Sequence, residues 1–356
     1  MLGGLRKIPV SPATFVRGAS SASATAAGES KRPAGCKNIV LIDAVRTPFA
    51  VSSTVYKDLL AVDLQRSAFS NLIERTQVSY DDVGHIVCGT VVQESRTSNI
   101  AREAALTAGF PDKARTAMRD LQRAKALPEK LSLGGTLVSN LLAPELPAIS
   151  EYTTGETMGH SGDRLAAAFG VSRREQDEFA LRSHSMADKA TKEGKLKDLT
   201  PYFVPRGKKQ ATVSTDNTVR PSTIEKLEKL KPAFVKPHGT ITAGNASPLT
   251  DGASAALVST EEFALRKGYK PKAVFRDTLF KYMGRSGKYG RIPMDKLNNW
   301  GGSLSLGHPF GATGIRLIAH AANRLEAEGG RFAVIAACAA GGHGVGMLLE
   351  RYTPSK

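Results

Sequence analysis

The last quarter of the chain limits its fold most tightly, because glycine-rich turns there alternate with one helix and two strands. Apolar spacing over residues 311–328 predicts a helix, and the wholly apolar run 332–338 predicts a short buried strand. Gly341 and Gly342 then separate this run from a second predicted strand at 345–351. A helix and two strands in so short a span indicate a layered α/β fold.

The same alternation occurs earlier in the chain. It predicts strands at 38–43, 85–88, 253–259 and 272–279, and helices at 56–75, 98–108, 172–193 and 261–267. Ser172 and Glu175 have the spacing of a capping box at the start of one of these helices. Because strands that alternate with helices usually pair in parallel, we expect parallel pairing. Two units that each open on a strand also suggest a duplicated fold.

The middle of the chain has a different character. Residues 113–130 are rich in lysine and arginine, and an apolar stretch follows at 131–142. Two interpretations remain open for this part: a basic amphipathic helix on a membrane surface with an apolar hairpin behind it, or a solvent-facing helix that covers part of the core. Residues 198–234 are polar and contain several prolines, which predicts a loop domain and not a core element.

Composition excludes several classes of protein. The net charge is +16, but basic runs interleaved with aromatic residues and zinc-finger or helix-turn-helix signatures are missing, so we expect no nucleic-acid partner. No apolar run reaches the roughly 18 residues of a membrane-spanning helix. The three cysteines, Cys36, Cys88 and Cys338, are too far apart for a disulfide framework or a metal site. We therefore expect no bound metal or cofactor.

The first 28 residues are basic, lack acidic side chains and are rich in serine, alanine and threonine. This composition is typical of a mitochondrial transit peptide, and the lack of a long apolar core argues against a secretory signal. The alternative is a merely disordered tail. We expect the protein in the mitochondrial matrix or at the inner membrane.

Two residues in the last quarter indicate carbonyl chemistry. His308 stands among glycines at the mouth of a predicted helix, where the backbone can approach a ligand closely and the helix dipole adds positive charge. An imidazole there can take a proton from a thiol and then bind an oxyanion. Cys338 ends a strand just before a Gly-Gly turn, so its thiol can transfer protons beside exposed backbone N–H groups. The alternatives are a structural histidine and an inert buried cysteine.

Eight collinear motifs resemble the thiolase family, and they span nearly the whole chain after the leader. They occupy residues 45–49, 89–93, 99–102, 158–159, 239–247, 251–253, 307–314 and 338–342. The form of residues 300–310 is most similar to the β-subunits of mitochondrial trifunctional proteins. The resemblance implies a duplicated, layered α/β/α/β/α fold with a loop domain, both halves being truncated. The implied parts are a leader at 1–37, an N-terminal half at 38–112 plus 239–270, a loop domain with a membrane-facing basic segment at 113–238, and a C-terminal half at 271–356.

The resemblance also implies an activity: thiolytic cleavage of 3-ketoacyl-CoA by CoA, to acetyl-CoA and a shortened acyl-CoA, in fatty-acid β-oxidation. His308 would be the base that activates a nucleophilic cysteine, and Cys338 the acid that protonates the acetyl-CoA carbanion. The residues implied to contact CoA are Met158, Arg220 and Ser247, and those with oxyanion-binding backbone N–H groups are Ala340 and Gly341. CoA would be a co-substrate. A homodimer, a trifunctional α-subunit and the inner membrane surface would be the partners.

The chain departs from the family pattern at two places. The nucleophilic cysteine expected soon after Lys113 is missing, and so is the Asn/His-Glu-Ala-Phe motif expected after Phe280. Without the nucleophile no acyl-enzyme can form, so we expect little or no turnover. An incompletely read thiolase gene and a non-catalytic splice variant that binds partner subunits both remain open. A 3-ketoacyl synthase fits less well, because those enzymes use two histidines with the nucleophile.

Overall fold

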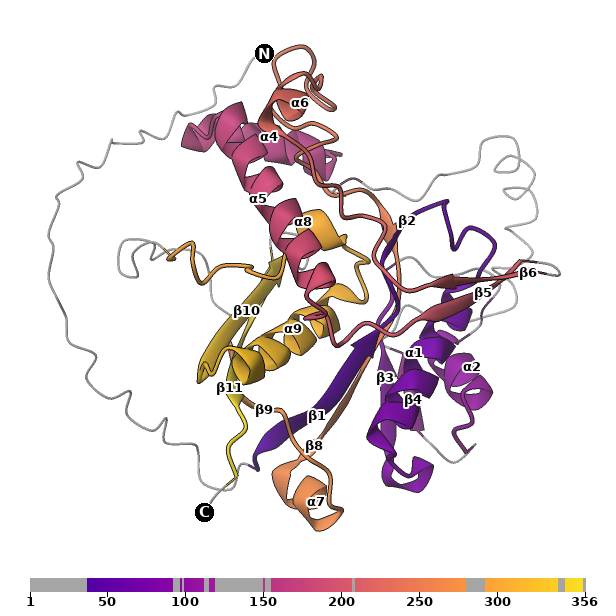
Figure 1. Ribbon diagram of the computed structural model, residues 1–356. Helices are drawn as coiled ribbons and strands as arrows, with labels where there is room; N and C mark the ends of the chain where they lie inside the picture. The colour runs from indigo at the N-terminus through magenta and orange to yellow at the C-terminus, as the bar shows by residue number, and fades with distance from the viewer. Residues whose placement is uncertain are drawn as a thin grey trace, which may run out of the picture. The chain divides into compact units, whose positions relative to one another are not determined.

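The main sheet has five strands and contains both the first and the last strands of the chain (Figure 1). In order across the sheet, the strands are β10 (Phe332–Cys338), β11 (Gly344–Arg351), β9 (Ala273–Leu279), β1 (Ile39–Arg46) and β8 (Ser254–Thr260). All five were predicted from apolar runs, and all five are confirmed. The computed structural model describes residues 37–91, 97, 99–111, 115–118, 150, 155–206, 209–279, 292–338 and 343–354.

The expectation of parallel pairing is wrong for this sheet. Every neighbouring pair in it is antiparallel. The physical reason is connection length, because the few residues between β10 and β11 can join only antiparallel strands. β8 and β9, which are linked through a helix, do run in the same direction, but β1 lies between them. Parallel pairing does occur between β3 (His85–Cys88) and β4 (Arg115–Met118), whose connection contains a helix.

Strands from the two predicted halves meet in the same sheet. β1, near the start of the N-terminal half, pairs with β9, at the start of the C-terminal half, with Ile39 opposite Phe275. The backbone ladder therefore links the halves directly. Two short strands, β2 (Ala50–Val51) and β7 (Thr250–Asp251), add a further link between distant parts of the chain.

Five helices lie close to the ranges predicted from the sequence: α1 (Ala61–Thr76), α2 (Ile100–Thr107), α5 (Arg173–Lys192), α7 (Glu261–Arg266) and α9 (Thr313–Ala327). The sequence analysis did not predict α4 (Met158–Phe169), α6 (Ile224–Glu228), α8 (Ser303–Leu306) or the 3-10 turn at Tyr80–Asp82. The capping box that begins α5 is confirmed, since the Ser172 hydroxyl accepts from the Glu175 N–H while the Glu175 carboxylate accepts from the Ser172 N–H. α1 begins later than predicted, where the Leu60 N–H donates to the Asp63 carboxylate.

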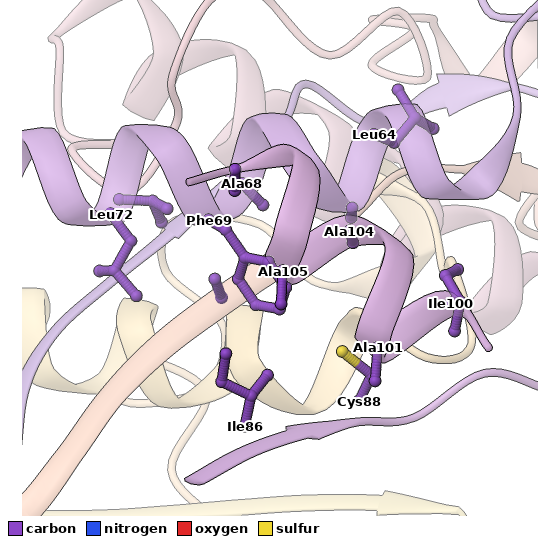
Figure 2. Packing of buried hydrophobic residues seen from close by; sticks show 14 of the residues in the cluster. Leu64, Ala68, Phe69, Leu72, Ile86, Cys88, Ile100, Ala101, Ala104 and Ala105 are labelled. Atoms are coloured by element: carbon purple, nitrogen blue, oxygen red, sulfur yellow. The ribbon is translucent and has the colours of Figure 1, made fainter. Parts of the chain in front are cut away.

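Two hydrophobic clusters lie on opposite faces of β8. The first packs α1 and α2 against β3 and β8, and Figure 2 shows Phe69 pointing from α1 toward Ile86 and β3. The second packs α9 against the rest of the sheet. Ala255 belongs to the first cluster and its neighbour Ala256 packs against the second, as alternation along a strand requires. The fold is thus layered, with helices on both faces of the sheet.

The prediction that residues 198–234 contain no core element is wrong. This stretch contains the hairpin of β5 (Tyr202–Arg206) and β6 (Lys209–Val213). Tyr202 and Val204 are buried in the cluster of α1 and α2, and the Tyr202 ring meets Tyr56 edge to face at 5.5 Å. Phe203, which lies between them, is 65% exposed, so only one face of this short strand enters the core.

The prediction of a helix at residues 113–130 is also wrong for residues 115–118, the part of this segment that the structure describes. Arg115–Met118 forms β4, in parallel register with β3. The rest of the basic segment and the apolar stretch 131–142 lie outside the described residues. Within the described part of the chain, no helix has both the length and the apolar character needed to cross a bilayer.

Candidate active site

His308 is held by a loop that only glycine can begin. Gly307 has a φ of +87°, and a Cβ there would lie 2.6 Å from a side-chain carbon of Thr250. The His308 N–H donates to the Thr250 hydroxyl at 3.3 Å, which ties the loop to β7. The imidazole is half-buried and packs edge to face on Phe310, with ring centres 5.0 Å apart. The loop therefore fixes both the backbone and the ring of His308.

The hydrogen bonds of the ring determine which nitrogen can act as a base. Nδ1 lies 2.6 Å from the Thr313 hydroxyl, and that hydroxyl donates its proton to the Pro309 carbonyl at 3.0 Å. The hydroxyl must then accept from Nδ1–H, which leaves the lone pair on Nε2. Burial, and after it the charge of Arg316, lowers the pKa of His308 below its usual value. The neutral imidazole can therefore take a proton at physiological pH.

Cys338 ends β10 at the same end of the layer. Its thiol is reduced and exposed. α9 packs against β10 and is joined to it by a short connection, so the two run in opposite directions. A helix of the length of α9 and a strand of the length of β10 both span about 20 to 25 Å. The start of α9, which follows His308, and the end of β10 therefore lie at one end. The predicted partners Ala340 and Gly341 lie outside the described residues.

Cys88 cannot replace the missing nucleophile in this structure. Its side chain is buried between α2 and β3, beside Ala101 (Figure 2). Burial raises the pKa of the Cys88 thiol to about 11. A thiol that is buried and protonated is a poor nucleophile.

The three residues predicted to contact CoA are all exposed. Met158 begins α4, while Arg220 and Ser247 belong to loops. The Arg220 guanidinium donates to the Ala243 carbonyl at 3.1 Å, so it reaches the loop that carries Ser247. The Arg220 N–H donates to Nδ1 of buried His184 on α5 at 3.0 Å. The structure thus brings Arg220 to the Ser247 loop.

A polar scaffold under this loop escaped the sequence analysis. The buried Asp163 carboxylate on α4 accepts backbone N–H groups of Thr240 and Ile241 at 2.6 and 2.9 Å. The Asn245 amide donates to buried Asp177 on α5 at 2.9 Å. Both carboxylates therefore fasten the loop of Ser247 to the helices, and Asp163 sits on the helix that Met158 begins. An acidic residue at an otherwise core-facing helix position is the signal that could have revealed them.

A buried ion cluster, equally unforeseen, lies behind the His308 loop. The Arg46 guanidinium binds Asp198 at 2.7 Å and Asp216 at 2.6 Å, with side chains at most 1% exposed. Nε2 of His320 on α9 lies 3.3 Å from Asp198. Burial alone would raise the pKa of Asp198, but His320 and Arg46 outweigh it and hold that pKa far below its usual range. The cluster joins β1, the β5 region and α9.

Arg316 extends this support to the loop itself. It is buried on α9 and donates to the Ser303 hydroxyl on α8, so it bridges the two helices that flank His308. Within the described residues, no group of three histidine, cysteine or acidic side chains has the arrangement of a metal site.

Comparison with known families gives matches over most of the chain. The model of the thiolase N-terminal domain matches residues 39–122 and 117–262, and that of the thiolase C-terminal domain matches 281–351. A probable 3-ketoacyl-CoA thiolase of Caenorhabditis elegans is 50% identical, covering 88% of this chain and 94% of its own. The mitochondrial trifunctional enzyme subunit beta of Bos taurus is 43% identical, with 94% and 92% covered.

Solved structures agree in fold. The acetyl-CoA acetyltransferase of Bacillus anthracis superposes with a TM-score of 0.76 at 25% identity, covering 89% of this chain and 99% of its own. Human mitochondrial 3-ketoacyl-CoA thiolase gives the same TM-score and coverage at 24% identity. These similarities confirm the layered thiolase fold expected from the sequence.

The alignments also bear on the two departures from the family pattern. The alignment with the Caenorhabditis elegans relative is 423 positions long, whereas this chain has only 356 residues. The relative therefore contains internal residues with no counterpart here. The two matches of the N-terminal model meet at 117–122, close to Lys113. Together the family models, the identities and the fold establish that the chain belongs to the thiolase family of acyltransferases.

Proposed function

We propose that this chain is a mitochondrial 3-ketoacyl-CoA thiolase by descent that binds CoA thioesters but has little or no acyl-transfer activity. The observation that carries this proposal concerns its thiols. Between Cys88 and Cys338 the sequence contains no cysteine, and Cys88 is buried with a pKa raised to about 11. Acyl transfer through an acyl-enzyme requires an accessible thiolate, which Cys88 does not offer, and we assign Cys338 to the acid role and not to that of the nucleophile.

The proposed ligand is a 3-ketoacyl-CoA. The Caenorhabditis elegans relative is named for that substrate, and the fold is also that of human mitochondrial 3-ketoacyl-CoA thiolase in complex with CoA. The exposed Arg220 guanidinium supplies a positive charge for a CoA phosphate. Met158 and Ser247 would contact the rest of CoA, on loops and helices anchored by Asp163.

In this proposal the chain keeps the base, His308, and the acid, Cys338, but lacks the nucleophilic thiol. With a nucleophilic thiol present, Nε2 of His308 would accept its proton, and the thiolate would attack the 3-keto carbon. The carbon–carbon bond would break, and the departing acetyl-CoA carbanion would take a proton from Cys338. Without that thiol the first bond cannot form. His308 can then only orient the thioester oxygen, and Cys338 can only exchange protons with the acetyl group. Ala340 and Gly341 would supply backbone N–H groups at this point.

The relatives named mitochondrial trifunctional enzyme subunit beta support a proposal for location and partners. We propose mitochondrial β-oxidation as the pathway, the matrix side of the inner membrane as the site, and a homodimer with a trifunctional α-subunit as the assembly. The missing nucleophile favours a second candidate function, a non-catalytic protein that acts only by binding partner subunits.

The test is thiolysis of acetoacetyl-CoA and 3-ketohexadecanoyl-CoA by the purified chain, with the Caenorhabditis elegans relative as reference. We expect turnover far below that of the relative. Turnover within about tenfold, a difference of about 1.4 kcal/mol in barrier, would overturn the proposal.

Binding of CoA is measured separately by titration calorimetry. We expect Arg220→Ala to weaken CoA binding about tenfold, which corresponds to about 1.4 kcal/mol. Arg266→Ala, which removes another exposed arginine on α7, serves as the matched control and leaves binding unchanged. Equal binding by both variants would remove Arg220 from the proposed site.

A further inference from the structure

Strands β8 and β3 each have an open edge. Among the described residues, β8 pairs with β1 on one side only, and β3 pairs with β4 on one side only. Alternate N–H and C=O groups of a strand point to its two edges, so each open edge presents a row of backbone donors and acceptors. At one end of this row, the Gln65 side chain donates to the Ser254 carbonyl at 3.3 Å.

The two open edges border the same cavity. It has a volume of about 410 Å³ and is lined by residues 254–259 of β8 and by residues 84–89, which include β3. Phe69 and Leu72 of α1 also line it, as does Ile315 of α9. Because α1 and α9 pack on opposite faces of β8, the cavity has backbone edges at its sides and apolar helices on its two faces.

These boundaries are those of a missing strand. A strand lies about 4.8 Å from each neighbour, and the open stretch of β8 is long enough for about six residues, roughly 20 Å. A strand covered by helices on both faces carries apolar side chains on both. An acyl chain in the same place would cover two rows of backbone N–H and C=O groups without bonding them, which is unfavourable. An extended peptide bonds both rows.

The family comparison is consistent with an absent segment here. The two matches of the N-terminal thiolase model meet at residues 117–122, directly after β4, the strand that pairs with β3. The alignment with the Caenorhabditis elegans relative is also longer than this whole chain. The additional residues of the relative would therefore be inserted after β4, beside the cavity.

We propose that the slot between β3 and β8 binds an extended peptide segment of another polypeptide, about six residues long, uncharged, and apolar on both faces. The segment pairs with both open edges and joins β3 and β4 to the five-stranded sheet. The proposal concerns an interaction surface and does not depend on thiolase activity.

The test uses the 356-residue chain and a fluorescein-labelled peptide, Lys-Val-Ile-Val-Ala-Val-Ile-Lys, followed by fluorescence anisotropy and hydrogen exchange. We expect binding together with protection of amides in 85–88 and 254–259. A peptide with proline in place of the central alanine is the first control, since proline lacks an N–H and is excluded from central strands.

A matched pair of variants locates the site. Val258 lines the slot on β8 and is 47% exposed, whereas Val334 is 69% exposed on β10, the strand at the opposite edge of the same sheet. We expect Val258→Lys to weaken peptide binding at least tenfold, because a charge guards the edge, and Val334→Lys to leave it unchanged.

Several results would overturn the proposal. Equal binding of the proline peptide, protection at β10 instead of β3 and β8, or equal effects of the two lysine variants would each exclude a strand in the slot. Displacement of the peptide by palmitate without amide protection would assign the cavity to an acyl chain. Dimerisation that Val258→Lys abolishes and Val334→Lys does not would assign it to a second copy of this chain.

Discussion

The His308 loop and the slot between β3 and β8 are neighbours that differ in how completely they are built. Gly311 and Ile315, just after His308, line the slot. Yet the loop is fixed by side-chain hydrogen bonds and by a buried ion cluster, whereas two strand edges beside it stay open. The partners of the loop all lie in retained parts of the chain. The comparison teaches that a chain lacking an internal segment can keep all the contacts of the His308 loop, while the nearby strands β3 and β8 lack neighbours in the sheet.

The largest expected effect tests the support of the loop. Arg46→Ala leaves Asp198 and Asp216 buried without their cation, so we expect a loss of about 3–5 kcal/mol in the free energy of unfolding. Urea denaturation measures it. The control, Arg75→Ala, breaks a partly exposed pair with Asp43 and is expected to cost less than about 1 kcal/mol. Equal losses in the two variants would show that the buried cluster does not hold this side of the molecule.

The backbone of the loop gives the next effect. Gly307→Ala forces an alanine into φ +87° and against Thr250, and we expect it to cost about 2–3 kcal/mol. Gly314→Ala is the matched control, because the space around Gly314 is open and alanine favours a helix by about 0.5–1 kcal/mol. Thermal unfolding distinguishes them, and a tolerated alanine at Gly307 would contradict the loop's rigidity.

Local sequence patterns predicted the strands of the main sheet, the start of α5 and the tight loop at His308. Apolar runs located all five strands of the main sheet, and the Ser172 capping box located the start of α5, because these signals depend on neighbouring residues. The glycines around His308 predicted a tight loop for the same reason. Strand direction in the five-stranded sheet was predicted wrongly, since it depends on which distant segments meet: β1 and β9 are paired although most of the chain separates them.

The supporting residues of the site could not be predicted, for a related reason. Arg46 is bound by Asp198 and Asp216, which lie in a stretch that is polar overall. A polar stretch resembles a solvated loop until its partner is known. Tyr202 and Val204 lie in the same stretch and are buried, because one face of their hairpin packs in the cluster that contains α1.

The scaffold below the proposed CoA site should respond to pH. Burial, and then Arg220, lowers the pKa of His184 to about 4, whereas an unfolded histidine titrates near 6.5. Between these values the unfolded chain binds a proton that the folded chain does not, so the stability from neutral His184 is complete above about pH 6.5 and is lost as the pH falls.

Urea denaturation at pH 7 and pH 5 checks this dependence. We expect His184→Gln to lose roughly 1–2 kcal/mol less than the parent chain over this interval, since glutamine can accept the Arg220 N–H without titrating. His85→Gln, at an exposed histidine of β3, is the control and should follow the parent chain. Identical pH dependence in all three proteins would exclude His184 as the group responsible.

The smallest expected effect on stability is for a substitution at the open edge of β8. It sharpens the comparison because β1 and β8 are paired and each carries a valine that can be replaced in the same way. Val258 on β8 is 47% exposed and borders the slot, whereas Val45 on β1 is fully buried. We expect Val258→Ala to change stability by less than about 0.5 kcal/mol, and Val45→Ala to cost about 2 kcal/mol, measured by urea denaturation. A loss at Val258 as large as that at Val45 would mean that another part of the chain already covers the edge, and the slot would then be closed. A small loss that becomes large when the strand peptide is bound would instead show that Val258 enters the core only once the sheet is completed.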